Sequence, residues 1–457
     1  MKKVFYKILI ISIVSIIFIY GFSGSYSISN TDNISYVTAL GIDLSDDKSS
    51  LQVTFEFMDT SSFSTSGDSS NTPPIINTIA ATSISSAINL LNVYVEKNIN
   101  LSHCKVFVFS QELAKKGISS ELTELMNNPQ VRPTSNLIIS KCSAREYVQN
   151  STSSLEKILT KYYDIFPKGS RSTGYTANIT IGNFYNNLLT KSSGNLAILG
   201  NLNELYPSES NNSQNSSSSE SSDSSGSMMS SSSGKNSSSS SSEEKNTDED
   251  NKKAKKKQAE KGTISVKNLI AGDSNIVGDR GTENIGLAVF NNGKYVGELN
   301  AMDTLCHLLI QEDVISFLLT IDNPEIYEHY IDVTLKENIS PHISIDISNE
   351  NPIININIDL TGRIALIKNS TTVPEENNID LDKISNAVNF SLKNEILEYL
   401  NKTKNTFNCD VDNFYRDAKR KFKTIDEYQK YDWINKYKNC DFNVNVNSLI
   451  HLGIIDS

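Results

Sequence analysis

Apolar positions along this 457-residue chain predict alternating strands and helices in its first half. Apolar side chains take every second position at residues 51–57, which predicts a half-buried strand, and recur at helical spacing over residues 84–95. Further strands are expected at residues 35–42, 105–109 and 135–140, and short helices after Ser110, at 120–126 and after Ser143. Strands that alternate with helices indicate an α/β or α+β domain.

The second half of the chain predicts a sheet with one long helix. Asn291-Asn292-Gly293 separates two apolar runs, a pattern typical of a β-hairpin. Alternating strands at residues 331–335, 343–347 and 354–360 predict an antiparallel sheet with one solvated face. The remaining elements expected here are helices at 302–310, 380–403 and 410–437 and a closing strand at 442–452.

The N-terminus has the pattern of a secretory signal. Lys2, Lys3 and Lys7 form a positive region, and residues 8–22 follow without any charge. The run is short for the ~20 residues that span a bilayer, so a cleaved signal peptide and an uncleaved signal anchor both fit. Positive charge before this run and an acidic body after it place the body outside the cytoplasmic membrane.

Residues 207–262 form an insertion that begins rich in serine and ends with an acidic stretch at 248–250 and a lysine cluster at 252–257. Almost nothing in it can be buried to offset chain entropy, so we expect it to be disordered. We interpret it as a flexible linker. The alternative is that the lysine cluster touches an anionic membrane or cell wall, which the adjacent acidic residues disfavour.

These patterns predict an α+β protein of several mixed domains, about three at ~150 residues per domain. The expected divisions are a signal peptide or anchor at residues 1–25, an N-terminal α/β domain at 26–206, the Ser-rich insertion at 207–262 and a C-terminal α+β region at 263–457. A further division of the last region into 263–330 and 331–457 is left open.

Composition narrows the classes of function. The formal net charge of −11 argues against a nucleic-acid binder, which would usually carry a basic domain. Five cysteines in 457 residues exclude a disulfide scaffold. His103-Cys104 and Cys306-His307 are adjacent pairs, but the side chains of neighbours diverge in a helix or strand and rarely hold one metal ion together. No catalytic motif stands out, so we assign no catalytic, cofactor-binding or metal-ligating residue.

Several stretches, in this order, carry a resemblance to a known family. Residues 34–43 read ISYVTALGID, and residues 100–117 read NLSHCKVFVFSQELAKKG. A strand containing LIIS then precedes Ser143-Ala144-Arg145-Glu146, and GLAVF at 286–290 precedes KYVG at 294–297. The order and spacing resemble the Ger(x)C family, the C subunits of nutrient germinant receptors in endospore formers.

The resemblance implies three mixed α/β domains, no enzymatic activity and no cofactor. It also implies a place on the extracytoplasmic side of the spore inner membrane, held by lipid, beside integral-membrane A- and B-type subunits. Family members usually carry a lipobox cysteine that receives the lipid. Ser25 occupies that position here, so lipidation is expected to fail, because a hydroxyl replaces the thiolate nucleophile. Either the uncleaved helix anchors the chain, which we favour, or partners retain a released protein.

We therefore expect an accessory receptor subunit that helps convert nutrient binding into ion or dipicolinate release through protein contacts. Which germinant is involved, and whether this subunit touches it, stay open. A membrane-anchored binding or adhesion module is the alternative, with the Ser-rich segment as its stalk. That segment interrupts two folded halves, which counts against a stalk. A secreted hydrolase is the third hypothesis, but the sequence offers no cluster of acids for it.

Overall fold

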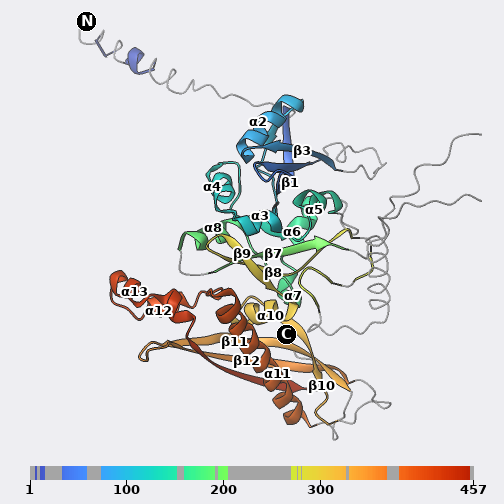
Figure 1. The fold of residues 1–457 in the computed structure, drawn as a ribbon, viewed down its shortest axis with the longest axis vertical. Helices are drawn as coiled ribbons and strands as arrows, with labels where there is room; N and C mark the ends of the chain where they lie inside the picture. The colour runs from blue at the N-terminus through green and yellow to red at the C-terminus, as the bar shows by residue number, and fades with distance from the viewer. Residues whose placement is uncertain are drawn as a thin grey trace, which may run out of the picture.

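The computed structural model describes residues 6–7, 11–15, 33–58, 74–151, 159–190, 194–203, 269–274, 276–278, 280–325, 329–367 and 380–452. These residues form two β-sheets with attached helices, arranged one beyond the other along the long axis (Figure 1). The predicted α+β fold class is confirmed. Ser25, the Ser-rich insertion and most of the N-terminal apolar run lie outside the described residues. In the part that is described, no helix is both long and apolar enough to cross a membrane.

The larger sheet is mixed, with the strand order β3-β2-β1-β5-β6-β7-β8-β9, and β4 pairs with the start of β1. The four central strands β1, β5, β6 and β7 run parallel, β2, β3, β8 and β9 pair antiparallel, and β4 pairs parallel to β1. Their bounds are β1 (Ile34–Leu44), β2 (Leu51–Phe57), β3 (Ile75–Ala81), β4 (Asn98–Asn100), β5 (Val106–Ser110), β6 (Asn136–Ser140), β7 (Asn195–Leu202), β8 (Thr282–Asn291) and β9 (Lys294–Leu299).

Helices cover both faces of this sheet. One face packs against α2 (Ile84–Tyr94), α3 (Gln111–Lys116), α4 (Ser119–Asn127) and α8 (Ile181–Thr190), and the other against α5 (Ala144–Asn150) and α6 (Leu159–Ile165). A short helix, α7 (Ser170–Thr173), contacts the chain just before the second sheet, where the amide of Ile315 donates to the carbonyl of Arg171 at 2.7 Å. Ser110 and Ser143 cap α3 and α5 as predicted, because their hydroxyls accept otherwise unpaired backbone N–H groups.

The half-buried strand expected at residues 51–57 is buried on both faces. Thr54 and Glu56 alternate with apolar residues, yet both are buried in β2. The hydroxyl of Tyr163, on α6, approaches Glu56 from the side expected to be solvated. Period-two alternation reports two different faces of a strand, but it does not tell which of them another element covers.

The second sheet has the order β10-β11-β12-β13 and carries α11 on one face. The antiparallel pairing predicted here is present, but the strands expected at 331–335 and 343–347 form one long strand, β11, and β10 was not predicted. Strand β13 lies parallel to β12. A parallel neighbour needs a crossover connection, and α11 with the helices after it supplies one. The bounds are α10 (Ala301–Ile310), β10 (Ser316–Asp322), β11 (Tyr330–Asp346), β12 (Ile353–Ile367), α11 (Leu381–Lys402), the π-helix η5 (Thr403–Phe407), α12 (Tyr415–Lys419), α13 (Ile425–Tyr431), α14 (Trp433–Tyr437) and β13 (Asp441–His451).

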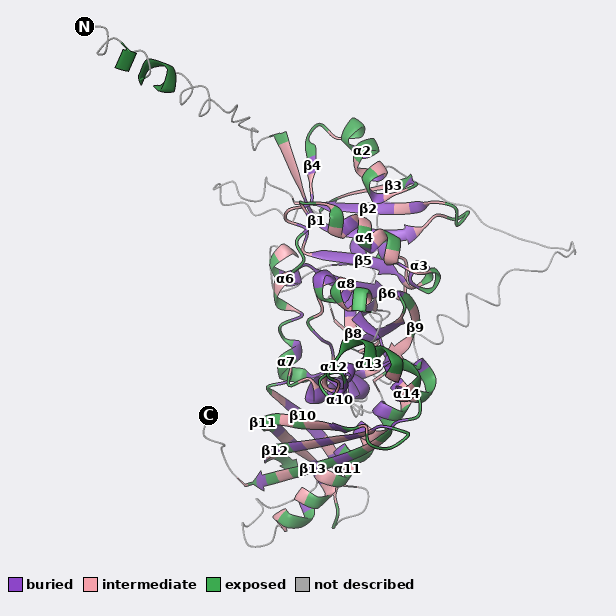
Figure 2. Cartoon of the chain, turned by 90° about the vertical axis from the view of Figure 1, so that its left-hand side faces the viewer, coloured by how far each residue is buried: buried purple, intermediate pink, exposed green. Residues whose placement is uncertain are grey.

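The chain after residue 263 contributes to both sheets. Strands β8 and β9 complete the first sheet through the predicted hairpin, in which Asn292 and Gly293 adopt positive φ angles of 50° and 73°. Helix α10 then leads toward the second sheet, and all ten of its residues are buried. Figure 2 shows this helix as a buried segment between the two sheets. The domain boundaries themselves stay a prediction.

Candidate functional site

A groove of about 290 Å³ lies where the two sheets meet. One side comes from α8 and the segments before and after it, and the other from the end of α10 and the loop that follows η5. Its lining is mostly polar and rich in amide side chains, which are Asn178, Asn183, Asn187, Gln311 and Asn413. Amide groups both donate and accept hydrogen bonds, so this lining suits an uncharged or zwitterionic polar group.

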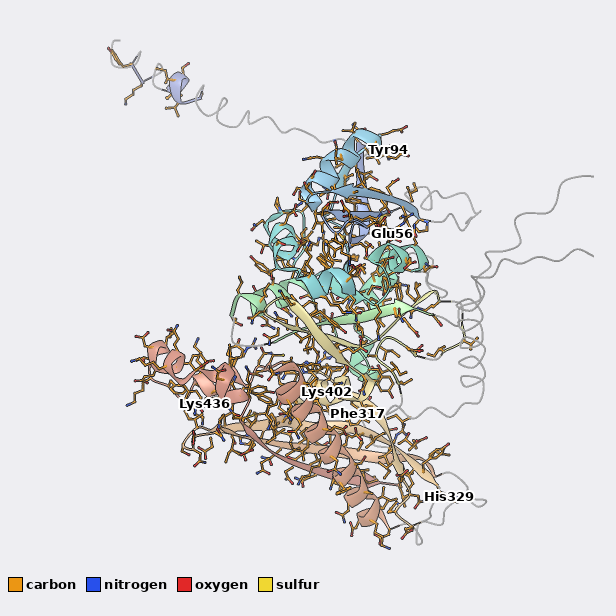
Figure 3. The ribbon with its side chains drawn as sticks, in the orientation of Figure 1. Glu56, Tyr94, Phe317, His329, Lys402 and Lys436 are labelled. Atoms are coloured by element: carbon orange, nitrogen blue, oxygen red, sulfur yellow. The ribbon has the colours of Figure 1, made fainter. Side chains whose placement is uncertain are left out.

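Helix α10 forms the floor of the site and is fixed at its N-terminus. Asn300 and Asp303 form a reciprocal capping box there. The Asp303 carboxylate also accepts a hydrogen bond of 2.6 Å from Lys402, at the end of α11. Figure 3 shows Lys402 at the level of the junction between the two sheets. The ion pair therefore joins the N-terminal turn of α10 to the end of α11.

His307 points from α10 into a buried polar cluster. Its Nδ1 lies 2.7 Å from Oδ1 of Asp412, and the Tyr399 hydroxyl donates to both oxygens of that carboxylate at 2.9 Å. Because a carboxylate can only accept, the Nδ1 atom carries the proton. Burial, and then the charge of Asp412, raise the pKa of Tyr399 far above its ordinary value, so Tyr399 keeps its proton and acts as a donor.

A second buried carboxyl, Asp410, organises the same loop. It accepts hydrogen bonds from the backbone of Phe414 and Tyr415, at 3.0 and 2.8 Å, and from Nε1 of Trp433 at 3.0 Å. Burial raises the pKa of Asp410 to about 7, against the opposing effect of these donors. The backbone carbonyl of Asp410 also accepts from the amide of Gly194, which ties the loop to the first sheet.

Asn413, in this loop, is among the residues that line the groove. It has a positive φ of 61°, a conformation that asparagine tolerates better than most residues. Its Oδ1 atom is buried and has no partner. The other polar groups of the cluster are satisfied by one another, so they hold the loop in place and are not free to react. The arrangement supports binding and positioning better than proton transfer.

The histidine–cysteine pairs diverge, as predicted. His307 enters the polar cluster, while Cys306 lies in the apolar core, where burial raises the pKa of its thiol far above the ordinary value. His103 packs edge-on against the ring of Tyr36, and Cys104 is buried in the core of the first sheet.

All five cysteines are free thiols. Burial raises the pKa of Cys142 to about 11 and those of Cys409 and Cys440 to about 12, so these thiols stay protonated at neutral pH and are weak nucleophiles. Among the residues that the structure describes, no three His, Cys, Asp or Glu side chains gather as metal ligands would.

Sequence reasoning missed the cluster of His307, Tyr399, Asp410 and Asp412. Its members come from three separate segments, and no local pattern brings them together. One usable signal was the Asp410-Val411-Asp412 spacing, in which two acids flank an apolar residue just before a run of aromatic side chains. Such acids, if they are buried, must find donors in the fold.

Comparisons with known proteins identify two family domains in the chain. Residues 28–200 match the family described as "Spore germination protein N-terminal domain", and residues 285–452 match "Spore germination B3/GerAC like, C-terminal". A solved structure, the crystal structure of the GerBC protein, is 12% identical, covers 90% of this chain and 96% of that chain, and superposes with a TM-score of 0.48. No curated protein sequence gives a significant match.

Proposed function

Since this chain belongs to the Ger(x)C family of spore germination proteins, we propose that it is a non-catalytic C subunit of a nutrient germinant receptor. It would act on the extracytoplasmic side of the spore inner membrane through contacts with A- and B-type membrane subunits. The observation that carries the proposal is the presence of both germination domains, in order, across the two halves of the chain.

The geometry of the junction supports a role through contacts. The buried polar groups at the groove are bonded to one another, and His307, Tyr399 and Asp412 hold the loop at residues 408–414 against α10 and α11. The apolar core extends from Leu287 and Val289 of the first sheet to the residues of the second. A continuous core of this kind holds the two sheets in a fixed relation.

Membrane attachment is part of the proposal and is supported by the sequence of residues 8–22, which carries no charge. With Ser25 in place of a lipobox cysteine, the apolar run is the remaining means of anchorage in this chain, unless partners alone retain it. A retained helix holds a protein far more firmly than one acyl chain would.

Deletion of the gene tests the receptor proposal. The strain should lack other C-subunit genes, so that no paralogue covers the loss. Spores are exposed to a panel of nutrients, and dipicolinate release and loss of optical density are recorded, with a non-nutrient trigger as the control. We expect failure on at least one nutrient and a normal response to the control trigger. Normal germination on every nutrient would contradict the proposal.

Two complementing genes sharpen this experiment. The full gene should restore germination, and so should a gene lacking residues 207–262 if that segment is only a linker. Tagged protein extracted from spore membranes should copurify with the A- and B-type subunits. Copurification with neither subunit, in a strain that germinates normally, would argue for a separate role.

A second candidate function, binding of a small polar ligand, is favoured by the amide-lined groove. The side-chain amide of Asn183, which lines the groove, would hydrogen-bond such a ligand. The test is thermal unfolding in the presence of each nutrient in the panel. A rise in melting temperature that Asn183→Ala abolishes would support the groove as a binding site, and no shift with any nutrient would remove this candidate.

A further inference from the structure

Helix α2 exposes three large apolar side chains on one side. Leu90, Val93 and Tyr94 are 48%, 87% and 78% exposed. Their spacing of three and four positions makes them neighbours on the helix surface. The helix also buries Ile84 and Leu91 against the first sheet, so it has two apolar faces, of which only one is used within the fold.

Helix α2 itself is polar but uncharged around these side chains; the carboxylate of Glu124, on α4, accepts from the backbone N–H groups of Ile84 and Ser85 at the opposite end of the helix. The sequence of α2, ISSAINLLNVY, contains no acidic or basic residue. Serine and asparagine flank the apolar side chains, and Asn92 is engaged in accepting a hydrogen bond from the backbone of Ile99 at 2.9 Å. The first charged residues beyond the helix, Glu96 and Lys97, have opposite signs. A surface of this kind meets no strong electrostatic penalty on entering a lipid headgroup region.

The topology places this surface beside the point where the chain enters the fold. Strand β4, which follows α2 after three residues, pairs in parallel with residues 34–36 at the start of β1. Figures 1 and 2 show α2 at one end of the molecule, and Figure 3 shows Tyr94 at the same extremity. Residues 23–33 connect the apolar run to β1 and reach at most about 40 Å at ~3.3–3.6 Å per residue.

We propose that Leu90, Val93 and Tyr94 of α2 rest in the interfacial layer of the lipid bilayer that anchors the N-terminal segment. This inference rests on the membrane attachment in the proposed function. A tyrosine with an exposed ring and hydroxyl is a typical residue of the membrane–water interface. Three side chains would bind lipid weakly by themselves, but the tether keeps them close to the surface and raises their effective concentration there.

A bilayer fits this surface better than a protein partner does. A stable protein–protein interface buries roughly 800 Å² on each side, with 20–30 residues per partner. The exposed apolar surface on α2 comprises three side chains of a short helix. Interfacial contact with lipid has no such size requirement, because the tether supplies most of the attachment.

Tryptophan fluorescence in vesicles tests the contact. The only native tryptophan, Trp433, is buried on α14 in the core beside the second sheet and gives a constant background. The full chain carrying Val93→Trp is reconstituted into phosphatidylglycerol–phosphatidylethanolamine vesicles whose acyl chains are brominated near the headgroups. Interfacial side chains lie about 5–10 Å into the headgroup and acyl boundary, so we expect the emission of the new tryptophan to fall roughly twofold relative to unbrominated vesicles. Phe390→Trp, at a 69% exposed position on α11, is the matched control and should show no quenching.

Vesicle flotation separates failure of the inference from failure of the anchor. Protein that does not float with vesicles overturns both the membrane attachment and this contact. Protein that floats, but whose Val93→Trp emission is not quenched, overturns the contact alone. The double substitution Leu90→Gln and Tyr94→Gln should reduce the quenching of Val93→Trp while leaving the circular dichroism spectrum unchanged. That result would support the lipid contact. Quenching that disappears when the A- and B-type subunits are present would assign this surface to a protein partner and overturn the lipid proposal.

Discussion

Replacing Glu56 with glutamine is expected to stabilise the first sheet at alkaline pH and to leave it unchanged in acid. Glu56 is buried in β2. Its Oε2 atom accepts hydrogen bonds from the Thr38 hydroxyl at 2.8 Å and from the Tyr163 hydroxyl at 3.4 Å, while Oε1 has no partner. Two donors do not replace the water that a carboxylate loses on burial, and this desolvation raises the pKa of Glu56 to about 7.

The sign follows from proton linkage. The native protein holds the Glu56 proton more tightly than the unfolded chain, whose pKa is near the ordinary 4.5. The contribution of Glu56 to the free energy of unfolding therefore falls as the pH rises from 4.5 to about 7, and it changes little above pH 7. Each pH unit in this window lowers the free energy of unfolding by about 1.36 kcal/mol. At pH 8 the ionised Glu56 therefore lowers it by about 3 kcal/mol. The glutamine amide is neutral and keeps an oxygen for the two hydroxyl donors.

Hydrogen exchange of the β1 and β2 amides, followed by mass spectrometry, measures this difference locally. Wild type and Glu56→Gln are compared at the same pH, so that intrinsic exchange rates cancel. At pH 8 the variant should exchange on the order of a hundredfold more slowly, and at pH 4.5 about equally. Glu350→Gln, at an exposed position between β11 and β12, is the control and should match wild type. Equal exchange at both pH values, or faster exchange at pH 8, would refute the reasoning.

Two further substitutions test the packing at the junction and in the hairpin. Tyr399→Phe removes the donor to the buried Asp412 carboxylate and should lower the free energy of unfolding by about 1.5–3 kcal/mol in urea titrations followed by tryptophan fluorescence. Tyr431→Phe, whose hydroxyl has no partner, should change it little, and equal effects would contradict this account. Gly286→Ala places a Cβ against the backbone carbonyl oxygen of Leu299 at a φ of +81° and should lower the free energy of unfolding by more than about 1 kcal/mol, measured by thermal unfolding. Gly278→Ala, whose Cβ would meet no atom closer than 3.9 Å, is its control, and an unchanged melting temperature for Gly286→Ala would contradict the strain.

Local signals in the sequence predicted most of the elements. Ser110 and Ser143 begin helices because a serine hydroxyl satisfies a free N–H group, and this chemistry needs only three neighbouring residues. The hairpin after Asn291 likewise depends on the two positive φ angles that Asn292 and Gly293 adopt. The long helix α11 begins after Asp380, whose side chain accepts from the backbone of Lys383.

What the sequence did not reveal depends on contacts between distant segments. Glu56 was expected on a solvated face, and only the arrival of α6 buries it. The parallel pairing of β13 with β12 follows from the path of the intervening helices and not from the strand's own pattern. For the same reason the cluster of His307, Tyr399 and Asp412 could not be found, since each residue alone fits an ordinary helix or loop.

Helix α10 explains how the two sheets act as one body. Its apolar residues belong to a core that includes Leu287 and Leu299 of the first sheet and residues of β10 to β13 and α11. Two of its polar side chains also have partners further along the chain, Asp303 at Lys402 and His307 at Asp412. Rotating one sheet against the other would expose that core and leave buried charges unpaired, which is strongly unfavourable. The shared core and these paired groups therefore hold the two sheets in a fixed relation.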